Sequence, residues 1–246
     1  MEWLGFVLLG MLFGTIGGMF GIGGGLIAIP MLALVFGLDQ HIAQGTGLVM
    51  VVPNVVMAIW GYHQRNRIDW GRALTLAVGG LVFGALGAWL AAGLPERAMR
   101  LGFAAFMVGI AGYTLYRLWR PLSYTPKALP NHRVLAGLGV VSGMTGGLFA
   151  IGSAVVATPV LTSVYGVSQV IAQGLSLVMA LPTTAVTLGI FAHHGQVNWA
   201  MGAALALGGV ISIRWGVRVA HILPDRWLKA GFAAFLLVCA AFLSLR

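Results

Sequence analysis

Long apolar runs separated by short polar stretches make up this chain. Six of the runs have the length of one membrane-spanning helix, since about 20 helical residues cross about 30 Å of hydrocarbon. They cover residues 42–62, 73–94, 99–118, 171–192, 200–219 and 228–245. The pattern therefore predicts an all-α, polytopic membrane protein with six ordinary transmembrane helices.

Two further apolar segments, residues 3–36 and 134–165, are too long for one span and are interrupted by glycines near the middle. A glycine inside a helix costs up to about 1 kcal/mol relative to alanine. We therefore predict that each segment is a hairpin of two short helices, unwound where glycines are densest. For Gly14, Gly17 and Gly18 close helix packing is the favoured interpretation.

The chain contains one module twice. A shift of 129 positions aligns residues 14–106 with residues 143–235 without a gap, and 35 of the 93 aligned positions are identical. The shared anchors include Pro30 and Pro159, Gln44 and Gln173, and Trp70 and Trp199. A gapless fit predicts one backbone path for both halves, and duplicated membrane halves often face each other across a central substrate site.

Composition places the chain in a lipid bilayer. Hydrophobic residues make up 59% and charged residues 8% of the 246 residues, and the mean hydropathy is +0.95. A soluble globule could not cover its surface with so few polar side chains. No charged segment with a cleavage site precedes Trp3, so we expect the start to be retained. Cys239 is the single cysteine, which excludes an internal disulfide and a cysteine metal cluster. We predict neither a metal nor a cofactor.

The formal charge of +9 reflects membrane topology rather than nucleic-acid binding, because Lys and Arg form no stripe that could follow phosphates. If both long segments are hairpins, 11 of the 14 basic residues collect on one face; if each crosses once, the split is 8 against 6. Cytoplasmic loops are enriched in Lys and Arg, which favours hairpins. The basic face then holds Arg65, Arg67, Arg72, Arg117, Arg120, Lys127, Arg133, Arg214, Arg218, Arg226 and Lys229.

The hairpin topology leaves an odd number of crossings in each half, so the halves must run in opposite directions. We predict two inverted-topology repeats, each a glycine-broken hairpin plus three transmembrane helices. The N-terminal membrane repeat covers residues 1–119, a proline-rich cytoplasmic linker covers 120–133, and the inverted C-terminal repeat covers 134–246. We see no separate soluble domain for an enzyme or nucleotide site.

The unwound glycine tracts are the leading candidate for a binding site. Unwound backbone at membrane depth is tolerated only where protein buries it or where it lines a cavity. The N–H groups that open the next half-helix, with the positive end of its dipole, suit an anion, and inversion supplies two such cradles facing each other. The candidate residues are Gly21, Gly23, Gly24 and Gly25 in the first tract and Gly152 and Ser153 in the second.

Polar side chains inside the apolar runs extend this site. Gln44 and Gln173 start spans beside the hairpins, and each amide either bonds the broken hairpin or donates to a substrate. Hydroxyls nearby offer further donors, although in membrane helices they often bond back to the preceding turn. Side chains just beyond Pro53 and Pro182 are costly in lipid unless used. These additional candidates are Thr46, Asn54, Ser176, Thr183 and Thr184.

Several short motifs occur once in each half. They are the glycine hairpins ending in Pro30 and Pro159, the helix starts Ala43-Gln44-Gly45-Thr46-Gly47-Leu48 and Ala172-Gln173-Gly174-Leu175-Ser176-Leu177, the loops ending Ile68-Asp69-Trp70 and Val197-Asn198-Trp199, and the turns Leu94-Pro95-Glu96-Arg97 and Leu223-Pro224-Asp225-Arg226. These motifs, over nearly the whole chain, resemble the TauE/SafE family of sulfite exporters. The resemblance implies a permease of the prokaryotic cytoplasmic membrane for sulfite, sulfoacetate, organosulfonates or related anions. Gly47 stands where the family more often has serine, which leaves the substrate open.

The carboxylates bear on how transport would be driven. All five lie at predicted helix ends or loops, so no span carries an evident proton relay or sodium ligand. An anion leaving a cell gains about 2.3 kcal/mol per charge per 100 mV of inside-negative potential. We therefore predict export by alternating access, in which the inverted halves rock about the hairpins. Uptake coupled through Asp39 or a backbone cation site stays open.

Other functions also stay open. An intramembrane hydrolase would use Ser153 with His193 or His194, but no G-x-S-x-G elbow surrounds Ser153, which aligns with Gly24. The adjacent histidines point about 100° apart on a helix, so an external helix end suits them better than a metal site. A non-transporting scaffold subunit is the third interpretation. The predicted partners are the bilayer and a small sulfur oxyanion or sulfonate, a homodimer being compatible with the sequence.

Overall fold

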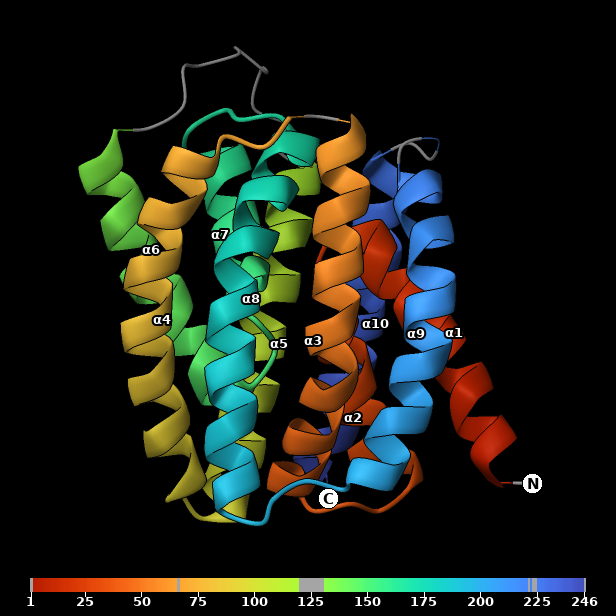
Figure 1. The fold of residues 1–246 in the computed structure, drawn as a ribbon. Helices are drawn as coiled ribbons and strands as arrows, with labels where there is room; N and C mark the ends of the chain where they lie inside the picture. Colours follow the sequence, from red (N-terminus) through yellow and green to blue (C-terminus); the bar gives the residue numbers. More distant parts are fainter. Residues whose placement is uncertain (1, 66, 120–130, 221, 223–224, 246) are drawn as a thin grey trace.

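Ten helices form the part of the chain that the computed structural model describes, residues 2–65, 67–119, 131–220, 222 and 225–245 (Figure 1). They are α1 (Glu2–Phe20), α2 (Gly25–Val35), α3 (Gln40–Arg65), α4 (Trp70–Ala92), α5 (Glu96–Trp119), α6 (His132–Phe149), α7 (Ala154–Ser163), α8 (Gln169–His193), α9 (Trp199–Ala220) and α10 (Asp225–Leu245). This confirms the predicted all-α fold. Residues 120–130 of the predicted linker and Leu223-Pro224 of one repeated turn lie outside the described residues.

Within the described part of the chain, six helices are long and apolar enough to cross a membrane. Their spans are Trp3–Phe20, Gln40–Gln64, Trp70–Ala92, Glu96–Trp119, Val170–His193 and Trp199–Val219. Five of them coincide with predicted spans, and the predicted run 228–245 lies within α10. The protein is therefore a multi-pass membrane protein. The sixth span belongs to α1, which the sequence assigned to a hairpin.

The hairpins differ in one respect from the prediction of two short helices. The first arms, α1 and α6, have 19 and 18 residues, whereas the second arms, α2 and α7, have 11 and 10. The first arms stay helical through Gly14 and Gly18 because these glycines face backbone of a neighbouring helix. A Cβ on Gly14 would lie 2.5 Å from Gly209 Cα, and one on Gly18 would lie 2.5 Å from Ile213 O. The packing predicted for Gly14 and Gly18 is thus confirmed.

The same glycine packing recurs in the other half. There α6 lies against α4, and a Cβ on Gly143 would lie 2.5 Å from Gly80 O. Gly17 faces its own hairpin turn, so that a Cβ there would meet the backbone N of Gly24. Bare glycine faces let these helices approach to backbone contact, which is how helices associate in lipid without a hydrophobic driving force.

Each hairpin packs on a helix of the opposite half. The arm α1 contacts α9, and α6 contacts α4, while α3 packs on α8 and α5 on α10 between the halves. In Figure 1 the hairpin of α1 and α2 opens toward the lower end of the bundle, and that of α6 and α7 opens toward the upper end. The two helix breaks therefore lie inside the bundle.

The repeated loops that end in Trp70 and Trp199 are helix caps. Asp69 accepts hydrogen bonds from the Arg72 backbone N at 3.1 Å and from Arg72 Nη1 at 2.8 Å at the start of α4. These bonds, above all the backbone one, hold the pKa of the Asp69 carboxyl below its usual value. Asn198 Oδ1 accepts from the Met201 N at 3.1 Å at the start of α9. An acceptor at this position satisfies N–H groups that the first helical turn leaves free.

Candidate functional site

The predicted unwinding occurs where the glycines are densest. The arm α1 ends at Phe20 and α2 begins at Gly25. Between them Gly21, Gly23 and Gly24 have φ values of 65°, 70° and 95°. This left-handed region costs a residue with a Cβ about 1–2 kcal/mol, which is why glycine is suited to it.

The second break has the same form with fewer glycines. Ala150, which aligns with Gly21, has a φ of 56°, and Gly152 has a φ of 80°. Ser153 has right-handed backbone and precedes the first residue of α7, Ala154. The alanine thus holds a backbone conformation that the first copy gives to glycine.

The two breaks meet inside the protein. A Cβ on Gly25 would lie 3.7 Å from Ile151 Cα and 3.8 Å from Ala150 O, so the start of α2 lies against the second break. All residues from 21 to 30 and from 150 to 155 are buried. The structure therefore brings the predicted glycine and serine positions of both halves together at the interior.

Gln173 bonds the first hairpin. Its Nε2 donates to Phe20 O at 3.0 Å, at the last turn of α1. The hydroxyl of Tyr62 donates to Gln173 Oε1 at 2.8 Å and lies 3.3 Å from Gly18 O. Of the two roles considered for this glutamine, hydrogen bonding to the hairpin is the one in this structure. Tyr62 was missed from the sequence because it lies 111 residues from its partner.

Gln44, at the matching position of the other half, has no such bonds. Its side chain is 0% exposed, and neither its Nε2 nor its Oε1 has a hydrogen-bond partner within the described part of the chain. The position that matches Tyr62 is Phe191, which has no hydroxyl. The two glutamines are identical in sequence but differ in their surroundings.

Several predicted side chains have local structural bonds. Thr46 Oγ1 accepts a hydrogen bond from the Asn198 backbone N at 3.0 Å, which ties the start of α3 to the loop before α9. Thr183 Oγ1 donates back to Met179 O at 3.1 Å. Thr184 bonds back to its own helix in the same way. Asn54 Nδ2 donates to Gly23 O at 3.3 Å, and its Oδ1 has no partner among the described residues.

Four hydroxyls on or beside the second hairpin are buried and unpaired. Threonines elsewhere in these helices bond back to the preceding turn, as is usual in membranes. The exceptions within the described helices, none of which finds a partner there, are Ser142, Ser153, Thr158 and Ser176. We call these four residues and Gln44 the second-hairpin polar set.

The first hairpin has no counterpart of this set. The four positions that match the hydroxyls are Phe13, Gly24, Ile29 and Gly47. A Cβ on Gly47 would lie 3.1 Å from Ile29 Cγ1, so Gly47 faces Ile29 across α3 and α2. Ser176 and Thr158 stand at the two matching positions of the second copy. Ser142 and Thr158 were missed from the sequence, although each replaces an apolar residue of the other copy, which is the signal that marks them.

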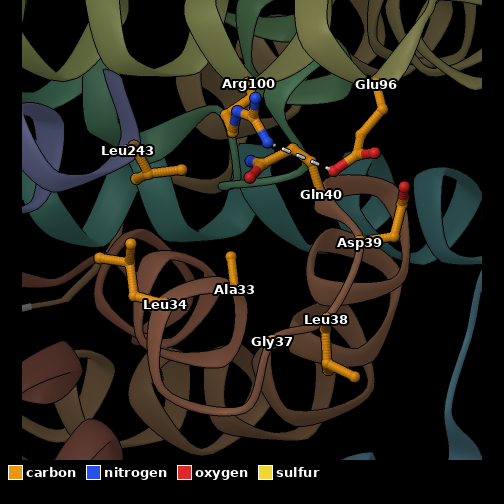
Figure 2. Close-up of a pocket in the computed structure, with 9 residues that line it drawn as sticks. All are labelled: Ala33, Leu34, Gly37, Leu38, Asp39, Gln40, Glu96, Arg100 and Leu243. Carbon is orange, nitrogen blue, oxygen red and sulfur yellow. Dashed lines mark ion pairs between the residues drawn. The ribbon is translucent and has the colours of Figure 1, made fainter. Parts of the chain in front are cut away.

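A pocket of about 320 Å³ (Figure 2) lies at the starts of α3 and α5, which are at the lower end of the bundle in Figure 1. Its polar lining is Asp39, Gln40, Glu96 and Arg100. Asp39 Oδ1 accepts a hydrogen bond from the His41 backbone N at 2.8 Å. Burial alone would raise the pKa of the Asp39 carboxyl, but hydrogen bonds with His41 N–H and with the Glu96 side chain bring this pKa below its usual value. Sequence reasoning missed Gln40 and Arg100.

The histidines at the end of α8 lie far from Ser153. A Cβ on Gly152 would lie 3.4 Å from Thr184 Cγ2, and His193 is nine residues further along the same helix. Nine helical residues span about 14 Å. The serine and histidine of the hydrolase interpretation therefore cannot form a catalytic pair in this structure.

The fold defines a multi-pass helical membrane protein with broken helices and buried polar groups at its interior. The family model described as Sulfite exporter TauE/SafE matches residues 6–243. The chain belongs to this family, whose members are membrane transporters rather than enzymes.

Relatives across bacteria and archaea agree with this assignment. The Probable membrane transporter protein MJ0441 of Methanocaldococcus jannaschii is 25% identical over 255 residues, which cover 97% of this chain and 94% of the relative. The Probable membrane transporter protein YjnA of Bacillus subtilis is 26% identical over 246 residues, 94% of this chain and 96% of the relative. No solved structure matches the chain significantly.

Proposed function

We propose that this transporter moves a sulfur-containing anion, such as sulfite, sulfoacetate or an organosulfonate, out of the cell. The family description names sulfite export, whereas the names of the relatives give no substrate. The observation that carries the proposal is the second-hairpin polar set, five buried polar side chains that have no hydrogen-bond partner among the described residues.

An oxyanion is the ligand that this set fits. Each buried donor left unpaired costs about 1–3 kcal/mol, so the set is stable only if a ligand or water completes it. Hydroxyls and the amide Nε2 of Gln44 donate hydrogen bonds, and sulfur oxyanions offer several acceptors. The start of α7 adds the positive end of a helix dipole.

The first hairpin would complete the site from the other side. The start of α2 lies against Ala150 and Ile151, so an anion at the second break also faces this helix end. Gly21, Gly23, Gly24 and Gly25 would contribute backbone rather than side chains. Asn54 donates to Gly23 O and Gln173 to Phe20 O at the first break, and both, together with Thr183, are further proposed contacts.

Alternating access would come from two inverted repeats. The hairpins open toward opposite ends of the bundle, and equivalent contacts recur with the halves exchanged (Figure 1). Four helix ends with an arginine lie at the upper end of the bundle. They are the starts of α4 (Arg72) and α6 (Arg133) and the ends of α5 (Arg117) and α9 (Arg218). Cytoplasmic ends are rich in Lys and Arg, so we assign the upper end to the cytoplasm.

The test is flux of labelled sulfite, and of a sulfonate, through proteoliposomes of the purified chain. We expect flux that increases when an imposed potential drives the anion toward the positive side, because each charge gains about 2.3 kcal/mol per 100 mV. Protein-free liposomes are the control. Absence of sulfite and sulfonate flux under every imposed gradient would refute the substrate, and is also what a scaffold subunit predicts.

A further inference from the structure

The pocket at the lower end of the bundle contains a buried side-chain amide, that of Gln40, without hydrogen-bond partners among the described residues. Gln40 is 1% exposed, and neither its Nε2 nor its Oε1 has a partner among the residues that the structure describes. In Figure 2 its side chain points toward Arg100 inside the pocket. A buried amide offers two donors and an acceptor, and leaving them unpaired is costly, so a ligand is expected here.

Arg100 is also incompletely paired. Its Nη1 lies 3.7 Å from Glu96 Oε1, beyond hydrogen-bond range, and its Nε has no partner within the described chain. The side chain is only 20% exposed. A guanidinium in this state has donors free for an acidic group, which it would bind in a fork of parallel hydrogen bonds.

Acceptors for a positive group lie in the same pocket. Asp39 and Glu96 supply carboxyl oxygens in the same pocket as the positively charged Arg100. A simple anion would therefore be repelled by the carboxylates, and a simple cation would meet the guanidinium. The opposite wall is apolar, formed by Ala33, Leu34 and Leu243 (Figure 2).

We propose that this pocket binds a small zwitterion, an ammonium group joined by a short aliphatic chain to a phosphate or similar acidic group. Arg100 and the Nε2 of Gln40 bind the acidic group, and the carboxylates with Gln40 Oε1 bind the ammonium. The aliphatic chain lies on the apolar wall. A pocket of about 320 Å³ is at the lower limit for small-molecule sites, which suits such a ligand.

Part of the polar lining recurs in the repeat: Gln40, Glu96 and Arg100 match Gln169, Asp225 and Lys229. The positions that match Asp39 and His41 in the second half are Ser168 and Val170. Of the four polar lining residues, Asp39 is the one whose carboxylate the second copy lacks. Because helix ends lie at headgroup depth in a bilayer, the zwitterion could come from an ethanolamine phospholipid or from solution.

The test measures phosphoethanolamine binding to the purified full-length protein by calorimetry, with ethyl phosphate and ethanolamine as the two half-ligands. We expect phosphoethanolamine to bind at least about 10-fold more tightly than either half, since both charged groups are needed. Arg100→Gln and Gln40→Leu should each weaken binding about 10-fold. Arg97→Gln, one turn away and exposed, and Gln64→Leu, at the far end of α3, should leave it unchanged.

Arg100→Lys is the control for misfolding. It keeps the positive charge and should bind more tightly than Arg100→Gln, which a general loss of folding at this position would not predict. Equal binding of the zwitterion and ethyl phosphate, or unchanged affinity in Arg100→Gln, would overturn the proposal. Native mass spectrometry separates the sources: retained phosphatidylethanolamine that Arg100→Gln loses indicates a lipid, and soluble binding without it indicates a solute. Gln44→Leu should spare this binding, so failure of sulfite transport would leave the pocket proposal standing.

Discussion

The two glycine hairpins share a backbone path but differ in how their polar groups are paired. Around the first, Gln173 and Tyr62 form a closed set of hydrogen bonds with the carbonyls of Phe20 and Gly18. In the other half, the matching Gln44 has no hydrogen-bond partner among the described residues, and Phe191 replaces the tyrosine. Hydrogen bonds within the protein hold the first hairpin, whereas the polar groups at the second need a ligand or water to complete their hydrogen bonds.

The difference shows where function resides in a duplicated membrane protein. Duplication gives each half a helix break, and the two breaks are buried against each other. The departures from the repeat then distinguish an anchor from a binding site. The second copy has lost glycines, but it has gained the buried hydroxyls of Ser142, Ser153, Thr158 and Ser176.

Removing each glutamine amide should separate the two roles most strongly. In Gln44→Leu we expect sulfite flux to fall at least about 10-fold, with unchanged or slightly higher stability because an unpaired buried amide is gone. In Gln173→Leu we expect the free energy of unfolding to fall by about 2–3 kcal/mol, since Phe20 O and Tyr62 lose their partner. Proteoliposome flux and thermal unfolding in detergent measure both effects. Equal loss of stability in the two variants would show that Gln44 is also a structural anchor.

Exchanging Tyr62 and its counterpart Phe191 should move the tyrosine–glutamine hydrogen bond from the first hairpin to the second. Tyr62→Phe leaves Gln173 Oε1 unpaired and should cost about 1–2 kcal/mol of stability. Phe191→Tyr places a hydroxyl at the position matching Tyr62, where Gln44 can accept from it, and should raise stability while it slows flux. Measured with the same two assays, a faster flux in Phe191→Tyr would contradict the view that free polar groups at the second hairpin bind substrate.

The hydroxyls of the second-hairpin polar set can be removed one at a time. Ser176→Gly and Thr158→Val each remove one donor, so we expect several-fold weaker sulfite binding, about 1 kcal/mol per hydrogen bond. Ser153→Gly should also leave transport measurable, since the first copy has Gly24 there. Thr187→Val is the control, because this hydroxyl already bonds to Thr183 O. Unchanged affinity in all three variants would place the anion elsewhere.

Hydropathy and glycine density were sufficient to predict much of this fold. Apolar run length gave five of the six spans, and the dense glycines located the break after Phe20. The length of the first arms could not be predicted, because Gly14 and Gly18 are consistent either with a break or with close packing. Only the facing backbone of α9 decides between them.

The polar contacts were less predictable from the sequence. Gln44 and Gln173 stand out as amides in apolar runs, but their pairing depends on residues far away in the chain, such as Tyr62. Thr158 looks like any helical threonine until its hydroxyl is found unpaired. Gln40 lies at a helix start, where an exposed side chain is ordinary, and only the packing of α5 and α10 around it shows that it is buried.

The smallest expected effect compares the two capped loops. The pKa of Asp69 is lowered mainly by the Arg72 backbone N–H, so its cap is fully present above the usual carboxyl value of 3.8 and is lost as pH falls through the lower folded value. Asn198 caps α9 without a charge. Because the Asp69 side chain is 40% exposed, solvent screens its interactions, and we expect the acid-sensitive part to be less than about 1 kcal/mol. Asp69→Asn should flatten the dependence of thermal stability on pH between about 5 and 3, whereas Asn198→Ala should shift the whole curve without changing its shape. A pH dependence that persists in Asp69→Asn would assign the acid sensitivity to Asp39, the other carboxyl with a lowered pKa, and not to the cap.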